Sequence, residues 1–66
     1  MEVIAKRGND SFLVKISDTK YAFVNMRYDK AVYSEYADTF LKHGYFEDCF
    51  INEDIITRIE YILARE

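Results

Sequence analysis

The chain has 66 residues, of which 50% are hydrophobic and 17% aromatic, and its formal net charge is −3. This length allows a single domain, 1–66, and excludes a second one, while the hydrophobic and aromatic content excludes an intrinsically disordered chain. Residues 1–33 hold six basic and four acidic side chains, whereas residues 34–66 hold three basic and eight acidic ones, so the acidic charge is concentrated in the C-terminal half.

Residues 1–27 are predicted to form three short strands of an antiparallel β-meander. Gly8 and Asn9 suit the first hairpin turn, because a glycine readily adopts the positive φ that a two-residue turn of this kind requires. In this register the opposing pairs would be Arg7 with Asp10, Ala5 with Phe12, Ile4 with Leu13, Val3 with Val14 and Glu2 with Lys15. Two of these pairs join opposite charges, which favours the register.

Asp18 and Thr19 are predicted to form the second turn. The pairs would then be Tyr21 with Ile16, Phe23 with Val14, Val24 with Leu13 and Asn25 with Phe12. In this arrangement the core face of the sheet would hold Val3, Ala5, Phe12, Val14, Ile16, Tyr21 and Phe23. The opposite face would expose an apolar row, for which we predict self-association and most simply a dimer: Ile4, Leu13, Val24 and Met26.

The middle segment, 28–51, has two interpretations. The spacing of Tyr33, Tyr36, Ala37, Phe40 and Leu41 favours a helix that ends near Gly44. The alternative is a fourth strand over residues 31–36, because valine and tyrosine are common in strands. Residues 45–51 would be a short strand or a loop.

Residues 52–66 predict an amphipathic C-terminal helix. Asn52 is a suitable N-cap, and Glu53 and Asp54 lie in the first turn, where the helix dipole favours acidic side chains. Asp54 and Arg58 are spaced for an ion pair along the helix. The apolar stripe consists of Ile55, Ile56, Ile59, Ile62 and Leu63. The predicted fold class is therefore α+β, a meander of three strands, or four in the alternative, packed on one face by this helix and by a weaker middle helix.

Few residues are suited to catalysis or metal binding. His43 and Cys49 are the only pair that could act as base and nucleophile, and the carboxylates beside Cys49 disfavour the reactive thiolate. The acidic residues of the C-terminal half show none of the spacings of calcium or zinc sites. We therefore expect no enzyme activity, no cofactor and no metal site.

The expected location is the cytoplasm. A single cysteine excludes an intramolecular disulfide and favours a reducing compartment. Residues 1–6 lack the basic and apolar regions of a secretory leader, and no apolar run approaches the about 18 residues that a membrane span needs.

Binding to another protein is the function that the pattern favours. Tyrosine buries a large area at little entropic cost, and carboxylates steer a protein toward basic partners. The predicted partner-binding residues are Glu35, Asp38, Tyr45, Glu47, Asp48, Glu53 and Asp54. We predict a non-enzymatic module that inhibits or regulates a larger protein, such as a nucleic-acid-handling or host-defence protein, by occupying a positively charged groove. Small size, acidity and the lack of a catalytic motif are also typical of inhibitors that phages and mobile elements direct against host enzymes.

Two alternatives remain at this point. The chain could be an accessory or structural subunit that docks on a larger complex without inhibiting it. It could also be a small nucleic-acid-binding regulator, which the negative net charge disfavours because phosphate neutralisation dominates the affinity for nucleic acid.

Overall fold

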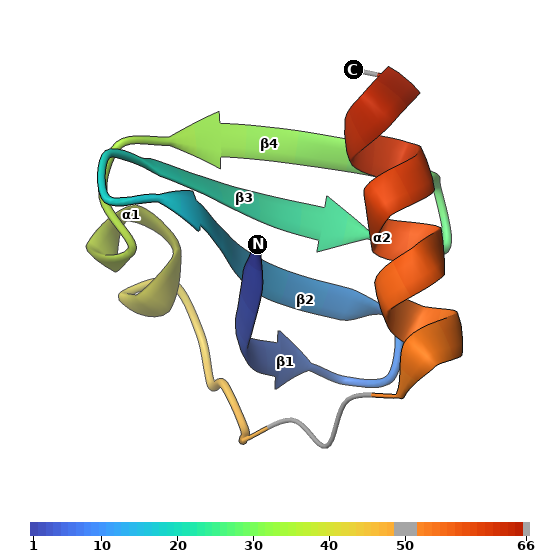
Figure 1. Cartoon of the computed structure of the whole chain (residues 1–66). Helices are drawn as coiled ribbons and strands as arrows, with labels where there is room; N and C mark the ends of the chain where they lie inside the picture. The colour runs from blue at the N-terminus through green and yellow to red at the C-terminus, as the bar shows by residue number, and fades with distance from the viewer. Residues whose placement is uncertain (49–51, 66) are drawn as a thin grey trace.

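The fold is a four-stranded antiparallel sheet with two helices, in a computed structural model that describes residues 1–48 and 52–65 (Figure 1). The strand order is β1-β2-β3-β4, so each strand pairs with its neighbour in the chain. The elements are β1 (Glu2–Arg7), β2 (Ser11–Ser17), β3 (Lys20–Asn25), β4 (Lys30–Ser34), α1 (Asp38–Leu41) and α2 (Glu53–Arg65). The predicted α+β class is confirmed.

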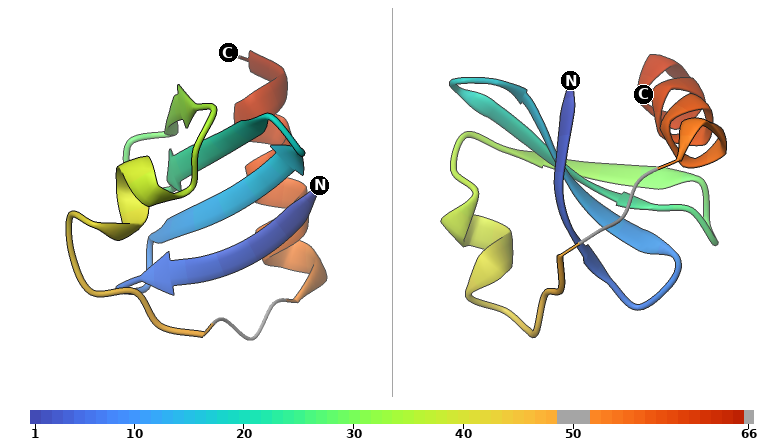
Figure 2. Two further views of the ribbon diagram at one scale, coloured as in Figure 1. Left: turned by 90° about the vertical axis from the view of Figure 1, so that its left-hand side faces the viewer. Right: turned by 60° about the horizontal axis from the view of Figure 1, so that its bottom comes forward.

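Helix α2 packs across one face of the sheet and forms the main core with it (Figure 2). Ile59 and Ile62 of the predicted stripe are 0% and 1% exposed. The predicted cap is also confirmed, because the Asn52 side-chain oxygen accepts a hydrogen bond of 3.0 Å from the Ile55 amide. The buried core residues on this face are Phe12, Val14, Ala22, Val24, Ile59 and Ile62.

The first hairpin differs from its predicted register near the turn. Gly8 has φ +66°, as the turn requires, but the loop between β1 and β2 contains Asp10 as well, so Arg7 pairs with Ser11 and Ala5 pairs with Leu13. An irregularity between Val3 and Ala5 restores the predicted pairing at the other end of the hairpin. The predicted pairs of Val3 with Val14 and Glu2 with Lys15 are confirmed, and the three pairs nearer the turn are wrong.

The second hairpin is shifted by one residue relative to the prediction. Leu13 pairs with Phe23 and Phe12 pairs with Val24, because an irregularity between Lys15 and Ser17 absorbs one residue of β2. A shift of one residue exchanges the faces of every side chain in a strand. Ala22 and Val24 therefore face α2, while Tyr21 and Phe23 lie on the opposite face, which corrects the predicted core face.

The predicted apolar row across the second face does not exist as a surface. Leu13 and Val24 are both 0% exposed, and they lie on opposite faces of the sheet because Val24 pairs with the neighbour of Leu13. Met26 packs, partly buried, against the core beneath α2. Ile4, at the irregularity in β1, is 37% exposed. The prediction that these four residues form one self-association surface is wrong.

The middle segment follows the alternative interpretation. Strand β4 extends the sheet by pairing with β3 from Tyr21 opposite Ser34 to Asn25 opposite Lys30, so the predicted helix is wrong over these residues. The helix that remains, α1, has four residues and buries Phe40. Beyond it, residues 45–48 form no strand, and Glu47 makes an isolated bridge with Lys6. The predictions for Cys49, Phe50 and Ile51 lie outside the described residues.

The side of the sheet opposite α2 is covered by α1 and the residues that follow it (Figure 2). The Phe23 ring stacks on Phe40, with 5.8 Å between centroids, and meets Phe46 edge-on at 5.9 Å. The middle helix is thus on the opposite face from α2, whereas the sequence predicted both helices on one face. Both faces of the sheet carry buried apolar residues.

Neither described helix is long and apolar enough to cross a bilayer. Helix α2 has 13 residues, which corresponds to about 20 Å at the usual helical rise of roughly 1.5 Å per residue.

Candidate functional site

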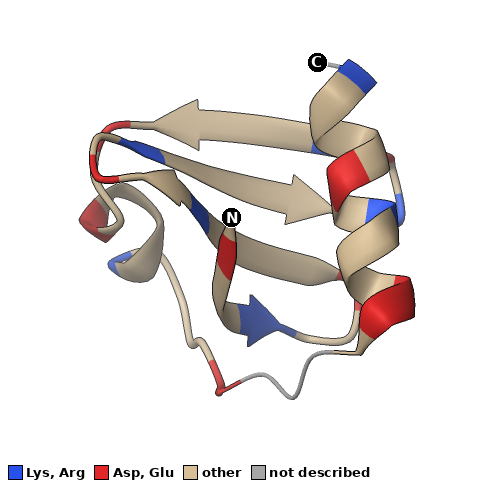
Figure 3. Ribbon diagram, viewed as in Figure 1, with Lys and Arg blue, Asp and Glu red and all other residues tan. Residues whose placement is uncertain are grey.

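The seven predicted partner-binding residues are all exposed, but they lie in different parts of the molecule. Glu35 lies in the connection from β4 to α1 and Asp38 is the first residue of α1. Glu53 and Asp54 form the first turn of α2, away from α1 (Figure 3). Tyr45, Glu47 and Asp48 follow α1 and run beside β1. The structure therefore brings together only some of the predicted residues.

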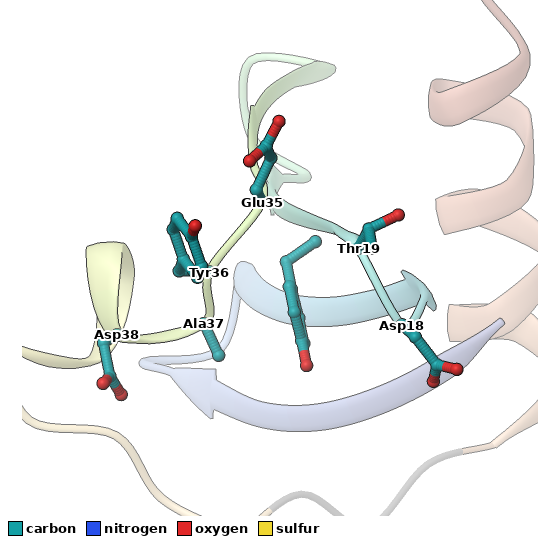
Figure 4. Close-up of a pocket in the computed structure, with 7 residues that line it drawn as sticks. Asp18, Thr19, Glu35, Tyr36, Ala37 and Asp38 are labelled. Atoms are coloured by element: carbon teal, nitrogen blue, oxygen red, sulfur yellow. The ribbon is translucent and has the colours of Figure 1, made fainter.

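A hollow of about 300 Å³ opens where the β2–β3 turn meets the β4–α1 connection (Figure 4). It is lined by Asp18, Thr19, Tyr21, Glu35, Tyr36, Ala37 and Asp38. Residues far apart in the sequence meet here because β4 pairs with β3, which sets Ser34 opposite Tyr21 and places the end of β4 beside the β2–β3 turn. We call this depression the acidic hollow.

Side-chain hydrogen bonds of Ser34 hold the β4–α1 connection in place. The Ser34 hydroxyl donates to the Thr39 hydroxyl at 2.8 Å and accepts from the Tyr36 amide at 3.2 Å. These bonds bend the chain out of β4 and into α1, so Tyr36 and Asp38 have a defined position at the rim of the hollow.

The three carboxylates of the acidic hollow point in different directions and do not converge on one point (Figure 4). In the part of the chain that the structure describes, no three histidine, cysteine or acidic side chains are grouped so that they could hold a metal ion. Asp18 has a nearby cation, since the Lys15 ammonium lies 3.4 Å from its carboxylate, but the Asp18 side chain is 98% exposed. Within residues 1–48 and 52–65, neither Glu35 nor Asp38 forms an ion pair.

A second hollow, of about 420 Å³, adjoins the first and shares Thr19 and Glu35 with it. The Lys20 ammonium lies 4.7 Å from the centroid of the Tyr33 ring, in a cation–π arrangement. The lining residues are Ser17, Thr19, Lys20, Tyr33, Ser34 and Glu35. This hollow contains one cation and one carboxylate, so the negative charge is concentrated in the acidic hollow.

The acidic hollow can bind positively charged groups that are spread over an extended area. Splayed carboxylates can contact separate cationic groups, and tyrosine faces attract cations through the ring quadrupole. Tyr36 is 69% exposed and therefore accessible to a partner. The exposed His43 does not line either hollow, and Cys49 lies outside the described residues.

Asp18 and Tyr21 were not predicted as site residues. The sequence predicts Asp18 in a turn and Tyr21 in the core, and only the pairing of β4 with β3 places them beside Glu35 and Asp38. The alternative fourth strand over residues 31–36 is the feature of the sequence that could have revealed this site. Pairing of that strand with residues 20–25 places Glu35 next to the β2–β3 turn.

The chain matches no protein-family model, and no curated protein or solved structure is significantly similar to it. Its function is therefore inferred from its surface.

Proposed function

We propose that the chain is a non-enzymatic module that binds a basic surface of a larger protein through the acidic hollow. The observation that carries the proposal is the combination of three exposed carboxylates with two tyrosine rings around one depression. Carboxylates steer and orient a cationic partner, whereas tyrosines supply contact area with little side-chain entropy to lose.

The dimensions of the acidic hollow suit a side chain better than a cofactor. Small-molecule sites usually occupy about 300–1,000 Å³ and enclose most of the ligand. The acidic hollow, at about 300 Å³, lies at the lower end of this range and is open to solvent. An arginine or lysine side chain could lie against Tyr21 and Tyr36 while its charge meets a carboxylate at the rim.

In its specific form, the proposal is that the chain inhibits or regulates a nucleic-acid-handling protein by occupying a groove that normally receives phosphates. The support is electrostatic. The net charge of −3 and the separate, exposed carboxylates of Asp18, Glu35 and Asp38 resemble a short series of negative charges rather than a chelating site.

The test compares two variants that each lose three acidic charges. The first carries Asp18→Asn, Glu35→Gln and Asp38→Asn, and the matched control carries Glu2→Gln, Asp10→Asn and Glu60→Gln, none of which lines the hollow. Circular dichroism first establishes that both variants fold. A labelled oligolysine peptide is then titrated against each protein at low salt, and the proteins that each variant retains from a lysate are compared.

We expect the hollow variant to lose about tenfold in affinity, chiefly through slower association, and the control to bind within about twofold of the original chain. The affinity of the original chain should fall as salt is added, because the contacts are exposed. Equal losses in the two variants, or a loss confined to the control variant, would contradict a binding site at the acidic hollow.

A further inference from the structure

The sheet face opposite α2 is covered by residues 38–48, which we call the strap. The strap is attached through the Phe40 and Phe46 rings, which lie 5.8 and 5.9 Å from the ring of Phe23. Its later part is joined to β1 by two backbone hydrogen bonds of 2.9 Å between Lys6 and Glu47. Leu13 lies on the same face as Phe23 and is 0% exposed, so the strap covers it.

Arg7, at the end of β1, connects the sheet and the strap with one side chain. Its guanidinium carbon lies 5.1 Å from the centroid of the Phe23 ring and 4.6 Å from that of the Phe46 ring. The Arg7 Nη2 group donates a hydrogen bond of 3.0 Å to the carbonyl of His43. The same guanidinium thus contacts a ring of the sheet, a ring of the strap and the backbone of the strap.

With the strap closed, one hydrogen-bond donor of Arg7 has no partner. The Arg7 Nε atom is buried and has no hydrogen-bond partner, and no carboxylate of residues 1–48 and 52–65 forms an ion pair with this arginine. Burial of a polar group without a partner is unfavourable, and more so for a charged side chain. When the strap is open, water could satisfy the Nε group, so this donor favours opening.

Gly44 allows the guanidinium to approach the strap closely. Its φ of +153° favours glycine, and a Cβ atom at this position would lie 2.6 Å from Arg7 Nη2 and 2.9 Å from Cζ. Any other residue would displace the guanidinium or the strap. The contact between Arg7 and the strap therefore requires glycine at position 44.

The core beneath α2 does not depend on the strap. Its buried residues come from β2, β3 and α2, and its partly buried neighbours come from the sheet, the β3–β4 turn and α2. From this separation and from the Arg7 contacts, we infer that Arg7 is a latch and that the strap opens as a unit while the sheet and α2 remain folded. Opening would uncover Leu13 and Phe23 and would move Asp38, a wall of the acidic hollow, so the fold contains a two-state element beside that hollow.

The test is amide hydrogen exchange of the full chain, read by NMR. The Lys6 and Glu47 amides report the strap, because each donates to the other residue across the contact. The amides inside the β2–β3 ladder report the core. In the original chain we expect the two strap amides to exchange at least tenfold faster than the ladder amides.

Arg7→Lys keeps the charge but loses the planar group that stacks between two rings. We expect it to accelerate strap exchange by about a further tenfold and to leave the ladder rates within about twofold. The matched control is Arg27→Lys, because Arg27 stacks on the exposed Tyr28 ring at 5.7 Å, away from the strap. This control should change neither set of rates.

Gly44→Ala provides a second variant, which keeps the arginine at position 7 but disturbs its contact with the strap, and it should accelerate the strap amides selectively as well. Equal acceleration of strap and ladder amides in both variants would show that the strap unfolds only with the whole domain, and this would overturn the inference. Unchanged strap rates in both variants would overturn the role of the latch. The experiment needs no partner, so its outcome is independent of the proposed function.

Discussion

Arg58 of α2 forms an ion pair with Asp29 at the tip of the β3–β4 hairpin, with 2.7 Å between Nη2 and Oδ1. The same Nη2 group donates to the Met26 carbonyl at 3.2 Å. Asp29 has φ +52°, a conformation that aspartate tolerates better than most residues. The sequence predicted that Arg58 would pair with Asp54 along the helix, and the structure shows that it instead fastens the helix to the sheet.

The first prediction concerns this ion pair. The two side chains are 51% and 42% exposed, so solvent weakens the attraction. We expect Arg58→Ala to lower the free energy of unfolding by about 0.5–1 kcal/mol, with a smaller effect at high salt. Urea denaturation followed by circular dichroism measures this change. Arg65→Ala on the same helix is the control, and an equal loss in the two variants would contradict a specific contribution from Arg58.

The second prediction concerns the centre of the main core. Ile59 is 0% exposed and packs against the sheet. Ile59→Ala should lower the free energy of unfolding by about 2–5 kcal/mol, and Ile59→Val by about 0.5–1.5 kcal/mol. Because a domain of this size rarely has more than about 3–5 kcal/mol of stability, Ile59→Ala should be largely unfolded at 25 °C. Far-ultraviolet circular dichroism reports the loss of structure.

Ile56 supplies the comparison for this core position. It belongs to the predicted apolar stripe but is only partly buried. Ile56→Ala should therefore destabilise the domain less than Ile59→Ala. The reverse order would mean that α2 presents a different face to the sheet.

The third prediction concerns the start of α2. The Asn52 side chain accepts a hydrogen bond from the Ile55 amide, which otherwise has no partner inside the helix. Asn52→Ala should lower the free energy of unfolding by about 1 kcal/mol, whereas Asn52→Asp, which keeps the acceptor oxygen, should change it little. Thermal denaturation of the two variants side by side separates the cap from a general effect of substitution at this position.

The features that the sequence predicts correctly depend on local signals. The Asn52 cap and the Ile59 and Ile62 stripe can be recognised because each involves residues within a few positions of one another. The Gly8 turn was located for the same reason. Strand register depends instead on loop length and on single irregularities, and the ones beside Ile4 and Ile16 have no clear sequence signal.

The middle segment shows how tertiary pairing overrides a local pattern. Tyr33, Tyr36 and Phe40 have helical spacing, yet Tyr33 lies in a strand because residues 30–34 pair with β3. The same pairing determines the candidate site. Glu35 and Asp38 were predicted as exposed acids from composition, but their proximity to Asp18 follows only from the position of β4.

The fourth prediction tests whether the strap covers the sheet face that holds Leu13. If Leu13 were part of an exposed row, Leu13→Asp would give a folded protein with a changed oligomeric state. In the structure Leu13 is 0% exposed beneath the strap, so the new carboxylate would be buried without a partner while the strap is closed. We expect the variant either to unfold or to stay folded only with the strap open. Ile4→Asp is the control, because Ile4 is 37% exposed and the variant should remain folded. Urea denaturation followed by circular dichroism measures stability, and sedimentation velocity measures mass. A Leu13→Asp variant as stable as the original chain would contradict the burial of Leu13 beneath the strap.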